Sequence, residues 1–409
     1  MKKMVNVLSM LVLVTLLFSV APAYTLAQEE VVCEQDVVVQ ADDWLSKIAE
    51  KAFGNPLAFQ AIADATNAIA ATDDSYNRID DVNVIEPGWK LCIPSGEQAG
   101  AALATGERPT IALVVGVQGD AFYVTMERGA REKAEELGVD LIVDGPAQFN
   151  AVLQTPIVDA MIARGVDALL VAATDKQAMI EPLQRVHDAG IPVISVDTFI
   201  GDGDYESGPV TFPLSYLGSD NTEGGRIACE AIIESMGGSG KLYIQNVNPG
   251  ISTTDQREQG CKDAIEATNG AVELVGVDYN GDSAAVAAEQ TAAVLQREPD
   301  LGGIFGANLF SAEGAAQAVN NAGLQGEVKV ANFDAPEQAI TDLSEGLVDI
   351  VIAQSPAEMG SVGVEYAVQA IGGNTAGIPK RYPTGYTIIT PDNIDTPEAQ
   401  AAIYKSSAE

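Results

Sequence analysis

Residues 165–198, GVDALLVAATDKQAMIEPLQRVHDAGIPVISVDT, contain the unit that decides the fold. Two apolar runs, 168–171 and 192–196, flank a stretch with helical spacing that ends near Gly190. Short apolar runs without polar alternation are typical of strands that are buried on both faces of a parallel sheet. The stretch therefore predicts a strand, a helix and a second parallel strand.

The same pattern continues in both directions along the chain. Helical spacing recurs between the apolar runs, for example at Met126, Ala130 and Ala134. The further runs are 111–115, 141–143, 242–245, 272–277, 304–306, 328–333 and 350–353. Two consecutive series of this kind, without a long linker between them, predict an α/β fold of two doubly wound parallel-sheet lobes around one cleft.

Four polar side chains follow predicted strands at their carboxyl ends: Asp197, Asn308, Asp334 and Gln354. That edge is where doubly wound sheets bind ligands. Carboxylates and amides form paired hydrogen bonds with neighbouring hydroxyls, so the set indicates a polyhydroxylated ligand. Each residue taken alone is also compatible with a helix N-cap or a turn.

Composition excludes several classes of function. The 409 residues include 58 acidic and 22 basic side chains, which gives a net charge of −36. Such a surface repels phosphate backbones, so we expect no nucleic-acid partner. His187 is the only histidine, which excludes multi-histidine metal sites, and its place near a helix end favours a capping role. We predict no catalytic residue, metal or cofactor.

The N-terminus and the cysteines indicate export. Lys2 and Lys3 precede an apolar run at 7–20 and small residues up to position 27, so residues 1–27 are predicted to be a cleaved signal peptide. An exported chain meets an oxidising compartment, where an even number of cysteines invites pairing. We predict the disulfides Cys33–Cys92 and Cys229–Cys261. Two buried free thiols are the alternative for the second pair.

Residues 31–95 form a separate module. A short strand at 37–40, helices at 44–52 and 56–67, and a closing strand after Pro87-Gly88 are expected from the pattern. Together with the stretch 42–49 and the ending 85–94, this order resembles a LysM domain, a small α+β module of bacterial cell-wall proteins. The resemblance implies peptidoglycan as a possible partner. Residues 96–108, rich in small residues, are expected to form a flexible linker.

Residues 108–390 resemble the periplasmic sugar-binding proteins of ABC transporters, in the ribose- and galactose-binding group. The resemblance rests on seven collinear motifs at 120–123, 196–197, 218–221, 257–260, 305–308, 333–334 and 353–354. It implies a first lobe of residues 109–219 plus 355–384 and a second lobe of residues 220–354 plus 385–409. Crossovers near 217–221, 354–357 and 382–386 would join the lobes, which would close on a sugar by hinge motion.

The resemblance also implies a set of ligand-binding residues. Phe122 and Tyr279 would stack on the sugar, with Tyr123 nearby. The hydrogen-bonding residues would be Asp120, Asp197, Asn308, Asp334 and Gln354. Two positions depart from the ribose-type pattern, because Thr198 and Asp255 stand where arginines are expected, while Arg257 matches a more structural position. The cleft would thus lose two cations and gain an anion, which predicts a sugar or polyol other than ribose, or an amine-bearing sugar.

We therefore expect a secreted, non-enzymatic receptor, in the periplasm or at the cell wall, that delivers its ligand to an ABC transporter permease. A wall-associated glycoside hydrolase is the main alternative, because acidic residues are plentiful. A ligand sensor for a chemoreceptor or kinase also stays open. A transcription repressor is disfavoured by the export signal and the acidity.

Overall fold

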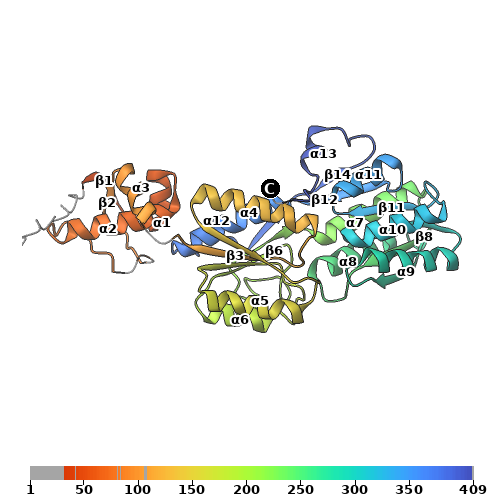
Figure 1. The fold of residues 1–409 in the computed structure, drawn as a ribbon, viewed down its shortest axis with the longest axis horizontal. Coiled ribbons are helices and arrows are strands. Elements are labelled where there is room, and N and C mark those ends of the chain that lie inside the picture. Colours follow the sequence, from red (N-terminus) through yellow and green to blue (C-terminus); the bar gives the residue numbers. More distant parts are fainter. Residues whose placement is uncertain (1–31, 42, 81, 83, 106–107, 408–409) are drawn as a thin grey trace, which may run out of the picture.

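The computed structural model describes residues 32–41, 43–80, 82, 84–105 and 108–407, which form three sheets. The predicted signal peptide, residues 1–27, lies outside the described residues. Two six-stranded sheets build the two lobes, and a two-stranded sheet belongs to the N-terminal module (Figure 1). Within the described residues, no helix is both long and apolar enough to cross a bilayer.

The N-terminal module has the predicted order of strand, helices and strand. Its elements are β1 (Cys33–Val38), α1 (Leu45–Phe53), the 3-10 turn η1 (Pro56–Ala58), α2 (Phe59–Ala70) and β2 (Lys90–Pro94), with β1 and β2 antiparallel. Leu45, Ile62 and Leu91 are fully buried in a small core of its own. The predicted disulfide Cys33–Cys92 is present and joins the two strands.

The expected flexible linker is wrong for residues 96–105, which form helix α3 (Gly96–Thr105). The Ser95 hydroxyl accepts the Gln98 N–H at 3.2 Å, and the Ser95 carbonyl accepts the Ala99 N–H at 2.9 Å. Ala99 is buried in the core of the module. The alanine-rich composition that suggested a flexible linker also has the highest helix propensity, and the serine cap starts the helix.

The first lobe is a parallel sheet with strand order β13-β7-β6-β5-β3-β4. Its strands are β3 (Thr110–Val114), β4 (Asp140–Asp144), β5 (Ala168–Val171), β6 (Val193–Val196), β7 (Tyr216–Ser219) and β13 (Arg381–Thr384). Its helices are α4 (Ala121–Leu137), α5 (Ala151–Arg164), α6 (Ile180–Asp188) and α12 (Pro356–Ile371). Helices α4 and α12 cover one face, and α5 and α6 cover the other (Figure 1). The four-residue strands β5 and β6 are fully buried, as their continuous apolar runs predict.

The second lobe has strand order β14-β12-β11-β10-β8-β9, in which only β14 is antiparallel. Its strands are β8 (Gly240–Asn246), β9 (Val272–Tyr279), β10 (Leu301–Gly306), β11 (Lys329–Phe333), β12 (Ile350–Ala353) and β14 (Thr387–Ile389). Its helices are α7 (Asn221–Ser235), α8 (Ser252–Ala267), α9 (Ala284–Arg297), α10 (Leu309–Ala322), α11 (Glu337–Glu345) and α13 (Pro397–Ala401).

Helices α7 and α8 pack unusually closely, and this packing positions the start of α8 at the cleft. A Cβ on Gly225 would lie 2.0 Å from the Arg257 carbonyl oxygen, and a Cβ on Gly260 would lie 1.8 Å from the Thr222 carbonyl oxygen. Both positions therefore require glycine. The second predicted disulfide, Cys229–Cys261, is also present and links the same two helices, so the alternative of two free thiols is wrong.

The chain passes between the two lobes three times, after β7, after β12 and between β13 and β14, as the resemblance predicts. Three buried side chains connect these crossings. The Ser219 hydroxyl donates to Gln354 Oε1 at 2.9 Å and lies 3.2 Å from the Thr384 hydroxyl. A continuous polar network therefore joins all three strands of the hinge.

Candidate functional site

A cavity lies between the lobes and is lined by residues of both. Both lobes contribute aspartates. The first lobe adds aromatic side chains, and the second lobe adds other polar side chains and one cation. The lining residues are Asp120, Phe122, Tyr123, Phe149, Asp197, Val247, Ile251, Thr253, Thr254, Arg257, Asp282, Asn308, Asp334 and Gln354.

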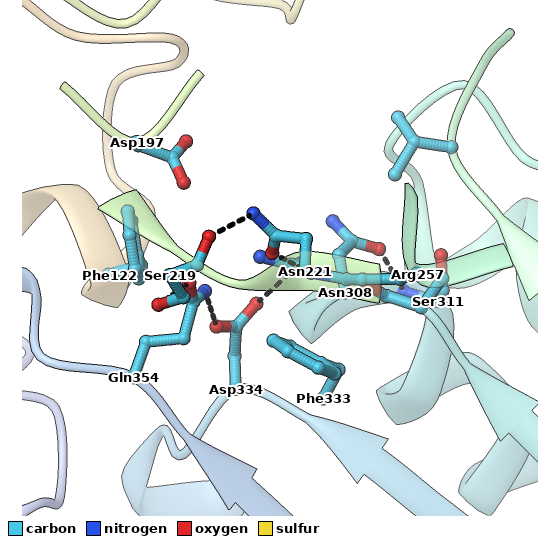
Figure 2. Close-up of polar contacts among 12 residues, drawn as sticks. Phe122, Asp197, Ser219, Asn221, Arg257, Asn308, Ser311, Phe333, Asp334 and Gln354 are labelled. Atoms are coloured by element: carbon cyan, nitrogen blue, oxygen red, sulfur yellow. Dashed lines mark hydrogen bonds and ion pairs between the residues drawn. The ribbon is translucent and has the colours of Figure 1, made fainter. Parts of the chain in front are cut away.

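Helix starts and strand ends direct the polar side chains into this cavity. Asp120 is the N-cap of α4 and accepts the Phe122 N–H at 2.8 Å, while Asn308 is the N-cap of α10. Asp197 and Asp334 follow β6 and β11 with φ angles of 60° and 81°. Non-glycine residues with positive φ are uncommon and concentrate at functional sites. Figure 2 shows Asp334 and Gln354 side by side at the ends of their adjacent strands.

The carboxylates share a common arrangement, in which a protein donor holds one oxygen of each. Tyr123 donates to Asp197 Oδ2 at 2.8 Å, and Asn308 donates to Asp282 Oδ1 at 2.8 Å. Within the described part of the chain, the second oxygen of Asp120, Asp197 and Asp282 has no hydrogen-bond donor. The cavity therefore offers acceptors to a ligand, while most of its own donors are already engaged.

Burial makes these carboxylates costly to ionise. It raises the pKa of Asp197 and of Asp282 to about 6, and it raises the pKa of Asp120 well above the usual range, with the charge of Asp334 adding to the effect. The charge of Arg257 partly offsets the rise at Asp197. A ligand that donates hydrogen bonds to these oxygens would stabilise their charged forms.

Arg257 is the one cation among the lining residues, and its side chain is only 3% exposed. Its Nε donates to Asn221 at 2.8 Å, and its Nη1 donates to the Ala307 carbonyl at 2.9 Å. The guanidinium stacks on the Phe333 ring at 3.8 Å, and Nη1 lies 3.8 Å from Asp334 Oδ2. Figure 2 shows Arg257 beside Asn221, Phe333 and Asp334.

Seven predicted site residues line the cavity: Asp120, Phe122, Tyr123, Asp197, Asn308, Asp334 and Gln354. Three do not. Tyr279 does not stack in the cavity, because its side chain lies 38% exposed at the end of β9 and its hydroxyl donates to Glu258. Thr198 is buried behind Asp197, and its hydroxyl has no partner in the described part of the chain.

Asp255 does not add an anion to the cavity, which corrects the expected charge balance. Its Oδ2 lies 2.6 Å from the Lys176 Nζ, so the pair joins the second lobe to the first outside the cavity. The Lys176 N–H also donates to the Gly250 carbonyl at 3.0 Å. Asp255 is therefore a contact between the lobes rather than a ligand-binding group.

We predict a small effect of this ion pair on ligand affinity, because the two side chains are 32% and 27% exposed. Such pairs contribute about 0.2–1 kcal/mol, or about 1.5- to 5-fold in affinity. A double-mutant cycle with Lys176→Met and Asp255→Asn, measured by calorimetry, checks the coupling. Lys241→Met, which breaks ion pairs within the second lobe, should leave affinity unchanged. A loss of ligand affinity above tenfold in Asp255→Asn would instead indicate that Asp255 binds the ligand.

Sequence reasoning missed five polar or aromatic lining residues: Phe149, Thr253, Thr254, Arg257 and Asp282. Arg257 was part of a motif but was interpreted as structural. Asp282, with φ of 65°, and Phe149 lie in loops without a strand-end signal. Within the described residues, no group of three or more His, Cys, Asp or Glu side chains is arranged to hold a metal ion.

Comparison with known proteins finds a family model that matches this chain and several proteins that are similar to it. A family model described as a periplasmic binding protein domain matches residues 111–375. The D-ribose/D-allose-binding protein of Pseudomonas aeruginosa is 30% identical over 66% of this chain and 85% of its own length. An ABC transporter solute-binding protein from Agrobacterium vitis, bound with α-D-tagatopyranose, is 45% identical, has a TM-score of 0.71, and covers 73% of this chain and 100% of its own. A solute-binding protein from Actinobacillus succinogenes with bound D-allose is 30% identical, with a TM-score of 0.64 over 70% of this chain and 98% of its own.

Proposed function

This chain belongs to the family of periplasmic binding protein domains, and on that premise we propose that it is an exported receptor for a monosaccharide or polyol. The sugar enters between the lobes, the lobes close on it by hinge motion, and the complex delivers it to an ABC importer. The receptor has no catalytic role.

One observation carries the proposal, namely the unpaired carboxylate oxygens that face the cavity from both lobes. Asp120 and Asp197 come from the first lobe, and Asp282 comes from the second. A sugar supplies several hydroxyl donors on a small rigid ring, which matches this excess of acceptors. Phe122 and Phe149 line the same cavity and offer apolar faces for the C–H side of the ring. Acidic sugars and sugar phosphates are excluded by repulsion from the carboxylates.

The relative from Agrobacterium vitis supports D-tagatose as the first candidate ligand, because it has the highest identity of the relatives reported above. An amine-bearing sugar is a second candidate, because its ammonium group would donate to the carboxylates and offset their charge. Ribose itself is disfavoured by the absence of the two arginines of the ribose-type pattern, at Thr198 and Asp255.

Calorimetry and thermal shift with D-tagatose, D-allose, D-ribose, D-arabinose, D-fucose and D-glucosamine test the proposal, with D-glucuronate as the anionic control. We expect one or more neutral or amine-bearing sugars to bind and to be recovered unaltered. A ligand at 100 times its Kd stabilises the folded state by about 2.7 kcal/mol. Absence of binding across the panel would contradict the proposal, and product release from labelled oligosaccharides would instead favour the glycoside hydrolase.

Delivery is tested separately from binding. Uptake of the labelled sugar should be lost in a strain that lacks this chain and restored by the wild-type chain. Retained uptake together with a lost chemotactic or transcriptional response would favour the sensor role, because both roles would use the same cleft.

We further propose that the LysM-like module positions the receptor at the cell wall, where tethering raises its local concentration. Its order of strand, helices and strand supports this role. The module contacts the first lobe, where Ser46 donates to the Gly372 carbonyl at 3.4 Å and Leu57 packs in the core of the lobe. It lies at the end of that lobe away from the second lobe, so it leaves the cleft free (Figure 1). Failure of the full chain to sediment with purified peptidoglycan would count against this role.

A further inference from the structure

The C-terminal end of the chain returns to the back of the cavity. After β14, helix α13 packs against that strand, and the following residues run to Tyr404. Figure 1 shows the described segment after α13 near the junction of the two lobes. Tyr404 is only 1% exposed and forms a bridge with Pro336 after β11. Tyr404 is therefore deeply buried next to the residues that line the cavity.

Tyr404 contacts three residues that line the cavity without lining it itself. Its hydroxyl donates to Asp334 Oδ1 at 3.1 Å and accepts the Gln354 backbone N–H at 2.8 Å. Its ring meets the Phe122 ring edge to face, with centroids 5.7 Å apart. The Gln354 side chain donates to the same oxygen of Asp334 at 2.8 Å. The orientation of Asp334 therefore depends on two donors, one of which comes from the C-terminal segment.

Two consecutive peptide groups of this segment reach different lobes. The Tyr404 N–H donates to the Ala335 carbonyl of the second lobe at 2.8 Å. The Lys405 N–H donates to the Thr125 hydroxyl, on α4 of the first lobe, also at 2.8 Å. These two bonds tie one short segment to both lobes, so the segment spans the boundary between them.

We propose that residues 402–405 form a strap that couples closure of the lobes to the geometry of the site. Tyr404 acts as a positioning residue for Asp334 and Gln354, and the bond between Lys405 and Thr125 fastens the strap to the first lobe. The inference rests on the proposed function, because it assumes that Asp334 binds the sugar.

The positioning role is tested with Tyr404→Phe, which keeps the ring against Phe122 and removes only the hydroxyl. Affinity for the sugar that binds the wild type most tightly should fall about tenfold, the scale of one hydrogen bond to a charged group. Tyr205→Phe is the matched control, because Tyr205 is equally buried and its hydroxyl also accepts a backbone N–H, from Ile200, away from the cavity. If the Tyr404 hydroxyl had a purely structural role, Tyr404→Phe and Tyr205→Phe would both be less stable and both would keep the wild-type affinity for sugar. That result would overturn the proposal.

A second readout separates positioning from general damage. In an Asp334→Asn background, Tyr404→Phe should change sugar affinity by less than about twofold, because neighbouring residues that act through one contact are not additive. If the affinity losses of the two single variants multiply in the double variant, the two residues act independently and the positioning role is wrong.

The fastening role is tested with Thr125→Val against Thr125→Ser. Serine keeps the acceptor for the Lys405 N–H, whereas valine has the size of threonine but no acceptor. We expect the valine variant to bind sugar more weakly, and its small-angle scattering without sugar to show a larger radius of gyration than the serine variant. Identical scattering of the two variants would overturn the strap. If no sugar of the panel binds the wild type, the proposed function fails, and the scattering comparison still decides the strap.

Discussion

Arg257→Met is expected to weaken sugar binding by at least about 100-fold and to lower the free energy of unfolding by about 3–5 kcal/mol, the scale for breaking a buried ion pair. The physical reason is that, among the described residues, Arg257 is the only cation that lines the cavity, together with four aspartates. Its side chain is 3% exposed, so water cannot replace its charge. Urea unfolding and calorimetry with the bound sugar measure the two losses.

The loss of stability has two sources. Methionine would leave the Asn221 side chain and the Ala307 carbonyl, both held by the guanidinium, without their donors. It would also remove the positive charge that lowers the pKa of Asp197, so that this carboxyl would titrate above its present value of about 6. The stacking on Phe333 would be kept in part, because methionine is also long and polarizable.

Two further variants separate charge from geometry. Arg257→Lys keeps the charge but cannot present a planar fork to Asn221 and Ala307 together, so we expect losses between those of the wild type and the methionine variant. Arg185→Met breaks an ion pair on the surface of the first lobe and should cost less than about 1 kcal/mol. Wild-type affinity in Arg257→Met would show that the carboxylates need no cation, which would contradict our account of the site.

Local patterns were sufficient to predict the two sheets and their strand ends. Strands 168–171 and 350–353 are found at the predicted residues, because a strand buried on both faces leaves a continuous apolar run. Asp197 and Asp334 follow from the same rule, since parallel strands bring their carboxyl ends to one edge. The helix at 96–105 was missed because small residues are common to linkers and to alanine-rich helices.

Side-chain direction was the information that the sequence lacked. Asp255 and Arg257 are two residues apart on α8, and residues with this spacing do not share a helix face. The structure turns Arg257 into the cavity and Asp255 toward Lys176, a partner that lies 79 residues away in the chain. Asp282 and Tyr404 reach the site from a loop and from the C-terminal segment, where no periodic pattern marks them.

Asp197→Asn is expected to stabilise the sugar-free protein at pH 8 while weakening sugar binding about 10- to 150-fold, the range for a hydrogen bond to a charged group. Asparagine keeps an acceptor for the Tyr123 hydroxyl but carries no charge. Stability therefore rises because a buried charge is removed, whereas affinity falls because the sugar loses a charged acceptor. Calorimetry and urea unfolding of the same preparations measure both effects.

The pH dependence identifies the cause of the stabilisation. Burial raises the pKa of Asp197 from 3.8 to about 6, so between these values the folded state binds more protons than the unfolded state. The free energy of unfolding of the wild type thus falls as pH rises through this window, by about 3 kcal/mol for a shift of about two units. The asparagine variant does not titrate, so its advantage should be near zero at pH 4 and should reach about 2–3 kcal/mol at pH 8. Asp392→Asn, at an exposed position, is the control substitution. An advantage that does not change with pH would contradict this account, because it would mean that the Asp197 carboxylate is hydrated when the site is empty.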